Sequence, residues 1–336
     1  MELFEQLKEL ALSTGADVIG VAPIERFKDF PAQENPIWIM PEAKSMIVLG
    51  HRTMRGSLRG TEEGTFFSHY PALGLGYVNI DIVPLTARAV CRFIEDLGKE
   101  AMPIGDHFAW AATDEYGQLR QRYSVPVRPG QPAPDVRLNL TKLAYLAGLG
   151  EIGWSGKLLN PKYGPRLIFG CVLTELELPA SEIVAPGTVC TRCKSCASAC
   201  TGGAISADES ETVSLGGYTF EIGKFDRKRC ELGKIGAEET EDGSYKPSKY
   251  SPFRKKPAML PFESNDICAG RGCMRECMIQ LEEGKRITNL FDVPFRRHPA
   301  WEVDWEGYNS GRIVNKTLPP NAPKHITEAN ANDINE

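Results

Sequence analysis

The stretch "CTRCKSCASACTGGAI" (190–205) places four cysteines within eleven positions of the chain. Cys190, Cys193, Cys196 and Cys200 follow the spacing C-x2-C-x2-C-x3-C, which is typical of loops that wrap iron–sulfur clusters. In that arrangement a tight loop presents three sulfurs to one [4Fe–4S] cube, while the fourth, on the helix that follows, points to a neighbouring cube. The spacing therefore predicts a site with two clusters, and it requires four further thiolates elsewhere.

Four further cysteines, Cys230, Cys268, Cys273 and Cys277, supply the required thiolates and bring the set to eight. Two zinc sites would also use eight thiolates, but zinc knuckles pair cysteines as C-x2-C, and three cysteines at successive spacings of three fit a cube better. Two features depart from the common pattern: Thr201 stands where a proline usually follows the fourth cysteine, and four residues separate Cys268 from Cys273. By the crossed pattern, we assign one cluster to Cys190, Cys193, Cys196 and Cys277, and the other to Cys200, Cys230, Cys268 and Cys273.

Two of the ten cysteines remain outside this set. Cys91 lies on a helix-like segment and Cys171 in a strand-like run, so both are expected to be small buried hydrophobic residues. The N-terminal stretch lacks a basic signal region, and no run reaches the roughly 18 apolar residues of a membrane span. We therefore expect a cytoplasmic protein without a membrane partner, where cysteines are metal ligands more often than disulfides.

Length and composition are those of a globular protein with two domains. The chain has 336 residues, of which 42% are hydrophobic and 25% charged, and its net charge is −5. Such a length is usual for two domains of roughly 100 to 200 residues each. The acidic balance argues mildly against a broad nucleic-acid surface.

The first 180 residues alternate helix-like and strand-like segments, which predicts an α/β domain. From about Leu178 the periodicity is lost and the cysteines begin, with a charged insertion between Cys230 and Cys268 that is expected to lie on the surface. Residues 291–336 are rich in proline and polar residues and are expected to form a surface tail. In the first half, the predicted strands are 17–22, 45–50 and 166–176, and the predicted helices begin at Leu3 and cover 81–98 and 141–148.

The second unusual stretch is "AGLGEIGWSGKLLNPKYGPRLIFGCVLTELEL" (147–178). Residues 148–153 formally satisfy G-x-G-x-x-G, but a nicotinamide-binding fingerprint needs a strand before it and a helix after it, and here a helix-like segment precedes it. The glycines could also serve only to let a loop turn tightly. Five glycines in seventeen residues, with Trp154 and Lys157 among them, favour a backbone that lies close to a large flat ligand.

Together, this glycine-rich stretch, the run "VLTELEL" and the two-cluster cysteine pattern resemble the epoxyqueuosine reductase and reductive dehalogenase superfamily. The segments "PEAKSMIVLGHR" (41–52) and "GYVNIDIVPLTARAVCRFIEDLGKEAMPI" (76–104) are also similar to its N-terminal domain, so the resemblance covers roughly residues 40–280. It implies an α+β fold, with a nitroreductase-like α/β domain over 1–180 that holds base-off cobalamin. A ferredoxin-like domain over 181–290 with two [4Fe–4S] clusters and the tail 291–336 would follow.

The resemblance also implies particular site residues. Epoxyqueuosine reductases place an acidic proton donor upstream of the glycine-rich motif, where Asp135 is the nearest acid, although its flanking residues differ from theirs. Reductive dehalogenases use a tyrosine, and Tyr145 lies two residues before the motif, where it could equally be a helix-face tyrosine. His51, His69 and His107 are further candidate acids, each alone in its segment. The implied cobalamin contacts are Gly148, Gly150, Gly153, Gly156, Lys157, Leu159, Pro161 and Gly164, with Trp154 as a neighbour.

These features predict an oxidoreductase, a cobalamin-dependent iron–sulfur reductase that acts on a small-molecule substrate by dehalogenation-like or epoxide and C–O reduction. Its electrons would come from a low-potential donor such as ferredoxin or flavodoxin and pass through the clusters to the corrin. One alternative is epoxyqueuosine reduction in tRNA, which is less favoured because nothing after Cys277 has helical-repeat periodicity. The other is a non-catalytic iron–sulfur protein that only transfers electrons.

Overall fold

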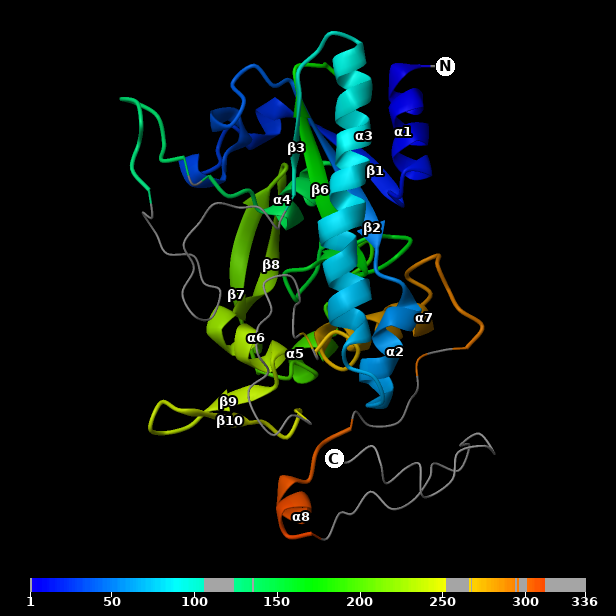
Figure 1. Ribbon diagram of the computed structural model, residues 1–336, viewed down its shortest axis with the longest axis vertical. Coiled ribbons are helices and arrows are strands. Elements are labelled where there is room, and N and C mark those ends of the chain that lie inside the picture. The colour runs from blue at the N-terminus through cyan, green and yellow to red at the C-terminus, as the bar shows by residue number, and fades with distance from the viewer. Residues whose placement is uncertain are drawn as a thin grey trace.

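An antiparallel sheet of four strands organises the N-terminal half of the chain (Figure 1). The computed structural model describes residues 2–105, 124–134, 136–251, 266, 268–293, 295 and 301–311. All three strand pairings of this sheet are antiparallel, so the described strands are not joined as parallel βαβ units. In order across the sheet the strands are β1 (Val18–Pro23), β2 (Ser45–Arg52), β6 (Leu167–Thr174) and β3 (Ala101–Ile104).

Both faces of this sheet are covered, which explains why its strands are nearly continuous apolar runs. Alternate residues of β2 enter different cores: Ile47 and Leu49 face one side, and Met46 and Val48 face the other. The first side packs against α1 (Leu3–Ser13) and α3 (Val83–Asp96), and the second packs against α4 (Leu140–Leu146) (Figure 1).

The two cysteines outside the predicted cluster set lie in these cores. Cys91 of α3 is 6% exposed and Cys171 of β6 is 0% exposed. Burial raises the pKa of each thiol to about 12. Their predicted role as small buried hydrophobic residues is confirmed.

The predicted segments of the first half are present with shifted ends. The helix expected over 81–98 begins at Val83, carries Pro84 in its first turn, and is followed by Gly98 at φ 75°. The preceding residues are wound in π-helical turns, η4 (Tyr70–Gly76) and η5 (Val78–Ile82), which no sequence pattern indicated. The remaining helices here are α2 (Arg55–Glu63) and the 3-10 turns η1 (Ile24–Phe27), η2 (Ala32–Glu34) and η3 (Pro36–Trp38).

A long hairpin and several short helices make up the second half, in the lower part of Figure 1. The hairpin turns at Gly216 and Gly217, whose φ angles of 62° and 82° suit a two-residue turn between antiparallel strands. The elements are β4 (Glu151–Ile152), β5 (Leu158–Leu159), α5 (Ser195–Ser198), β7 (Ile205–Leu215), β8 (Tyr218–Phe225), α6 (Arg227–Lys234), β9 (Ala237–Glu239), β10 (Tyr245–Pro247), α7 (Cys273–Glu283) and α8 (Trp305–Asn309).

Side chains from both halves share the same cores. Phe220 of β8 lies in the core of the sheet face that α4 covers, and Met278 of α7 packs in one cluster with Leu58 of α2. Within the described part of the expected tail, Phe295 is 4% exposed and Trp301 donates a hydrogen bond to Thr61 O at 2.7 Å. These tail residues pack against α2. None of the helices in the described ranges is long and apolar enough to cross a lipid bilayer.

Candidate functional site

Three segments that are far apart in the sequence carry the eight predicted ligand cysteines, and their helices α5, α6 and α7 all lie in the lower part of the molecule (Figure 1). The loop from Cys190 to Cys200 includes α5, which packs against α7. Helix α6 carries Cys230, and α7 begins at Cys273. All ten cysteines are free thiols.

The loop cysteines lie within electrostatic range of Cys277 on α7. Burial raises the pKa of Cys277 well above its usual value, and the neighbouring charges of Cys196 and Cys190 raise it further. Burial likewise raises the pKa of Cys196 to about 12, with contributions from Cys273 and Cys190. Cys193 is the exposed member of this group. The structure thus brings together the four cysteines assigned to one cluster.

The other four cysteines form a second group around the start of α7. Burial raises the pKa of Cys230 to about 11, against the opposing charge of Lys157. Burial also raises the pKa of Cys268 well above its usual value, with Cys273 and Cys230 among the charges that act on it. Cys273 is influenced by Cys200 in turn and also acts on Cys277 of the first group, so it lies between the two groups.

Hydrogen-bond donors are directed at three of these sulfur atoms. Trp154 N lies 3.5 Å from Cys190 Sγ, and Ala204 N lies 3.2 Å from Cys200 Sγ. Thr201 Oγ1 lies 2.6 Å from Cys268 Sγ. Donors of this kind stabilise thiolates and adjust the potentials of iron–sulfur clusters. In this respect the residues present fit the donor set of such clusters.

The described residues contain no group of three or more His, Cys, Asp or Glu side chains placed to hold a single metal ion. An iron–sulfur cube makes a different demand, because each thiolate binds its own iron atom at a separate corner. The absence of a single-ion site among these residues therefore does not bear on whether the cysteines can hold iron–sulfur cubes.

The glycine-rich stretch folds back on itself as the short hairpin of β4 and β5, with α4 before it. No helix follows the motif directly, so it lacks the strand–turn–helix context of a nicotinamide fingerprint. A Cβ atom on Gly148 would lie 2.2 Å from Glu182 O, and one on Gly150 would lie 2.3 Å from Leu159 O. These two glycines are required by the close approach of other backbone segments.

The remaining predicted cobalamin contacts differ in their surroundings. Gly153 and Gly164 face protein side chains, and Trp154 and Leu159 are 5% and 1% exposed. Gly156 has open space beside it, Pro161 is half-buried and Lys157 is exposed. Although Lys157 keeps solvent-accessible surface, the surrounding protein disfavours its charge and would lower its pKa; the charges of Cys273 and Cys230 outweigh this effect and raise that pKa. Lys157 therefore lies near the second group of cysteines.

Glu151, inside the glycine-rich stretch, holds the backbone that leads into the cysteine loop. Its carboxylate is 1% exposed and accepts hydrogen bonds from the N–H groups of Gly187, Val189 (at 2.6 Å) and Cys190. On the carbonyl side of the same segment, Arg286 donates to Gly187 O at 2.7 Å and to Val189 O at 3.4 Å. The sequence analysis did not identify Glu151 or Arg286 as residues that hold this segment. The position of Glu151 in a largely apolar stretch was a signal, because a buried acid needs hydrogen-bond partners.

The candidate proton donors lie in different places. Tyr145 is 0% exposed, its ring meets Phe220 edge-on at 5.6 Å, and burial raises its pKa to about 12. Its hydroxyl has no hydrogen-bond partner among the described residues. His51 is 1% exposed on β2, and His69 is half-buried beside Phe66. Two candidates lie outside the described residues, namely Asp135 and His107.

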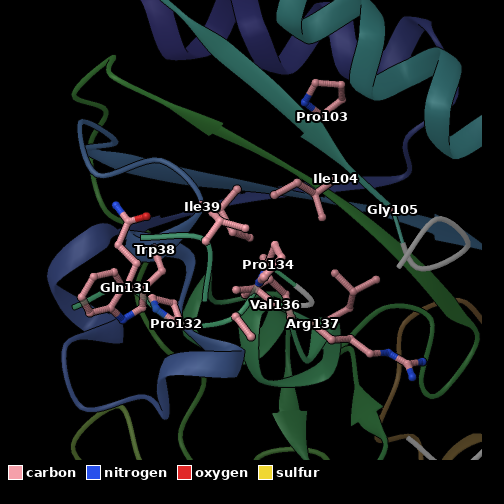
Figure 2. Close-up of a pocket in the computed structure, with 14 residues that line it drawn as sticks. Trp38, Ile39, Pro103, Ile104, Gly105, Gln131, Pro132, Pro134, Val136 and Arg137 are labelled. Atoms are coloured by element: carbon pink, nitrogen blue, oxygen red, sulfur yellow. The ribbon is translucent and has the colours of Figure 1, made fainter. Parts of the chain in front are cut away.

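A pocket of about 490 Å³ lies beside β3 and η3 (Figure 2). Apolar side chains predominate among its lining residues, but polar and apolar atoms contribute similar shares of its surface, with Trp38 and Gln131 at one end and Arg137 at the other. Pro134 and Val136, the chain neighbours of Asp135, are among the lining residues. Pockets of this size and character bind small molecules.

In a mixed fold, eight cysteines from three segments influence one another electrostatically, and three of their sulfurs have hydrogen-bonding neighbours. Cysteine-rich sites of this kind are common in iron–sulfur proteins. No protein-family model matches the chain. Among curated proteins, it is 41% identical over 73 residues to the tetrachloroethene reductive dehalogenase of Desulfitobacterium hafniense, an alignment that covers 21% of this chain and 13% of that protein. It is also 41% identical over 59 residues to the epoxyqueuosine reductase of Synechococcus sp. (strain RCC307), covering 18% of each.

Solved structures of the same two kinds of protein are also similar. The catabolic reductive dehalogenase NpRdhA matches with a TM-score of 0.48 and 18% identity, over 89% of this chain and 39% of that one. The epoxyqueuosine reductase from Streptococcus thermophilus matches with a TM-score of 0.41 and 16% identity, over 65% and 56%. The sequence matches confirm the predicted resemblance to this superfamily of reductases. The chain spans less than a fifth of each curated relative named here.

Proposed function

We propose that the protein is a cobalamin-dependent iron–sulfur reductase that acts on a small-molecule substrate. The observation that carries this proposal is the electrostatic influence that the predicted ligand cysteines exert on one another, with Lys157 of the glycine-rich stretch near Cys273 and Cys230. The kinship with named reductases supports the same class of reaction.

The first cluster would be held by Cys190, Cys193, Cys196 and Cys277, and the second by Cys200, Cys230, Cys268 and Cys273. Support comes from the charges that act between Cys277 and the loop cysteines, and between Cys273 and Cys200. Because Cys193 is exposed, the first cluster would be nearer the surface and would accept electrons from a donor such as ferredoxin or flavodoxin.

Cobalamin would supply the low-valent cobalt that performs the reduction. Of the predicted contacts, Gly156 and Lys157 have the open surroundings that a ligand requires, whereas Gly148 and Gly150 meet protein backbone. We therefore narrow the proposed corrin contacts to the segment around Gly156, Lys157 and Pro161. The pocket of Figure 2, with apolar side chains and the polar groups of Gln131 and Arg137, supports a small-molecule substrate.

The decisive experiment is anaerobic reconstitution with iron and sulfide, followed by addition of cobalamin and gel filtration. We expect about eight irons per chain and a corrin absorption that stays with the protein. Intact clusters without corrin would overturn the enzyme and leave an electron-transfer protein. Complementation of a strain that lacks epoxyqueuosine reductase would separately test the tRNA alternative.

The cluster assignment has a matched pair of variants. Cys193→Ser should remove one cluster and reduce the iron content to about half, because a cube needs all its thiolates. Cys91→Ala changes a buried cysteine outside the set and should leave the iron content unchanged. Full iron in Cys193→Ser would contradict the assignment.

A further inference from the structure

Thr201 directly follows the fourth cysteine of the loop, at the position where proline is common, and it contacts a cysteine from a different segment. Its Oγ1 lies 2.6 Å from Cys268 Sγ. A second contact joins Thr201 Oγ1 to Gly233 O of α6 at 3.4 Å. The hydroxyl therefore has one close sulfur partner and one distant carbonyl partner.

The chemistry of the site decides the direction of the short contact. A hydroxyl has a single proton to donate, and a thiolate bound to iron can only accept one. When Cys268 is a cluster ligand, the Thr201 hydroxyl can meet its sulfur only as a donor, and the sulfur at 2.6 Å is a nearer acceptor for the proton than Gly233 O at 3.4 Å. Proline at this position would have no donor to offer, so the departure from the common pattern adds a hydrogen bond.

The surrounding backbone fixes the hydroxyl in place. A Cβ atom on Gly233 would lie 2.9 Å from Thr201 Oγ1, and one on Gly202 would lie 2.1 Å from Arg229 O. The absence of side chains at these two glycines lets the turn after Cys200 press against α6. Thr201 is thus held between the helix that carries Cys230 and the segment that carries Cys268.

A negative charge lies close to this sulfur, because the Cys268 N–H donates a hydrogen bond to Asp266 Oδ1 at 2.8 Å. A donor directed at the sulfur offsets part of the repulsion between the two groups. Reduction of a cluster adds one electron, and part of the added charge resides on the ligand sulfurs, where hydrogen bonds stabilise it.

We propose that Thr201 is a tuning residue that raises the reduction potential of the cluster bound by Cys268, through the hydrogen bond from its hydroxyl to the sulfur. This inference rests on the proposed function, because it requires a cluster at Cys268. A higher potential at the second cluster would favour the passage of each electron from the first cluster inward.

The test compares Thr201→Val, which keeps the volume and removes the hydroxyl, with Thr201→Ser, which keeps the hydroxyl. Each reconstituted protein is titrated with dithionite in the presence of mediator dyes, and the reduced clusters are followed by electron paramagnetic resonance. We expect Thr201→Val to lower the potential of one cluster and leave the other unchanged, and Thr201→Ser to match the wild type.

Thr201→Ala serves as a second variant without the hydroxyl, and iron content and circular dichroism are measured for all proteins. Unchanged potentials in fully loaded Thr201→Val would overturn the inference. Loss of the cluster in both Val and Ala variants would also overturn it, in favour of a structural role. Absence of clusters in the wild type would instead mark failure of the proposed function.

Discussion

His51 and Glu151 are each about 1% exposed, but of the two only Glu151 has hydrogen-bond partners for its side chain among the described residues. The Glu151 carboxylate accepts three backbone N–H groups, which compensate for the lost water. His51 gives up its charge instead, since burial lowers its pKa to about 4, with Asp17 only partly opposing the change. Two predictions follow from this difference.

His51 should make the fold sensitive to mild acid. The unfolded chain binds a proton at His51 below its usual pKa of about 6.5, whereas the native chain does not until about pH 4. Stability contributed by neutral His51 is therefore complete above pH 6.5 and falls as the pH drops. Between pH 7 and 5.5 we expect a loss of about 1 kcal/mol, measured by urea unfolding. His51→Gln should reduce this loss and His69→Gln should not, and equal pH dependence in all three proteins would refute the assignment.

Glu151→Gln should loosen the entry to the cysteine loop. The amide retains one acceptor but turns an N–H group toward backbone donors, so at least one buried N–H loses its partner, at a cost of about 1 to 3 kcal/mol. We expect a lower urea midpoint and faster loss of iron to a chelator. Glu182→Gln removes the same charge from an exposed site and is the matched control. If both variants behaved alike, charge alone and not the hydrogen bonds would be responsible.

At the scale of elements, the helices and strands that local sequence signals specify were predictable. Features that depend on tertiary contacts were not. Helix α3 was predictable from its apolar spacing, Pro84 and Gly98, whereas the cluster site that the cysteine spacing indicates stays a prediction. The hairpin of β7 and β8 was missed, although alternating apolar residues flank its Gly216–Gly217 pair. The π-helical turns before α3 and the partners of Glu151 depend on segments distant in the sequence, which no local pattern encodes.

The hairpin turn offers a comparison between two adjacent glycines. Both have positive φ, so alanine at either position should cost roughly 1 to 2 kcal/mol of backbone strain. A Cβ atom on Gly217 meets open space, whereas one on Gly216 would lie 2.7 Å from Ile183 Cδ1. We expect Gly216→Ala to lower the urea midpoint more than Gly217→Ala. The reverse order would show that the hairpin does not pack as described.

For the whole molecule, buried polar contacts join the two halves of the chain. Arg166 is 1% exposed and donates to Thr53 O at 2.9 Å and to Asn289 Oδ1 at 2.6 Å. Arg275 of α7 pairs with Glu62 of α2 at 3.3 Å, and both side chains are buried. The half of the chain that forms the four-stranded sheet and the half that carries the predicted ligand cysteines should therefore unfold together.

The pair between Arg275 and Glu62 can be tested by a double-mutant cycle. Removing one partner of a buried pair takes away the charge that faces the other, so Glu62→Ala should cost about 3 kcal/mol even though Arg275 also lies 3.9 Å from Glu276. Arg275→Met alone should cost a similar amount, and the double variant should cost clearly less than the sum. Additive losses in chemical unfolding would show that the two residues do not interact energetically.

Helix α7 carries Cys273 and Cys277 four residues apart, close to one helical turn, with a rise of about 6 Å between them. In the proposed protein these two residues ligate different clusters. The pitch of a helix would then set the tunnelling distance between the cubes, independent of any opening or closing of the chain.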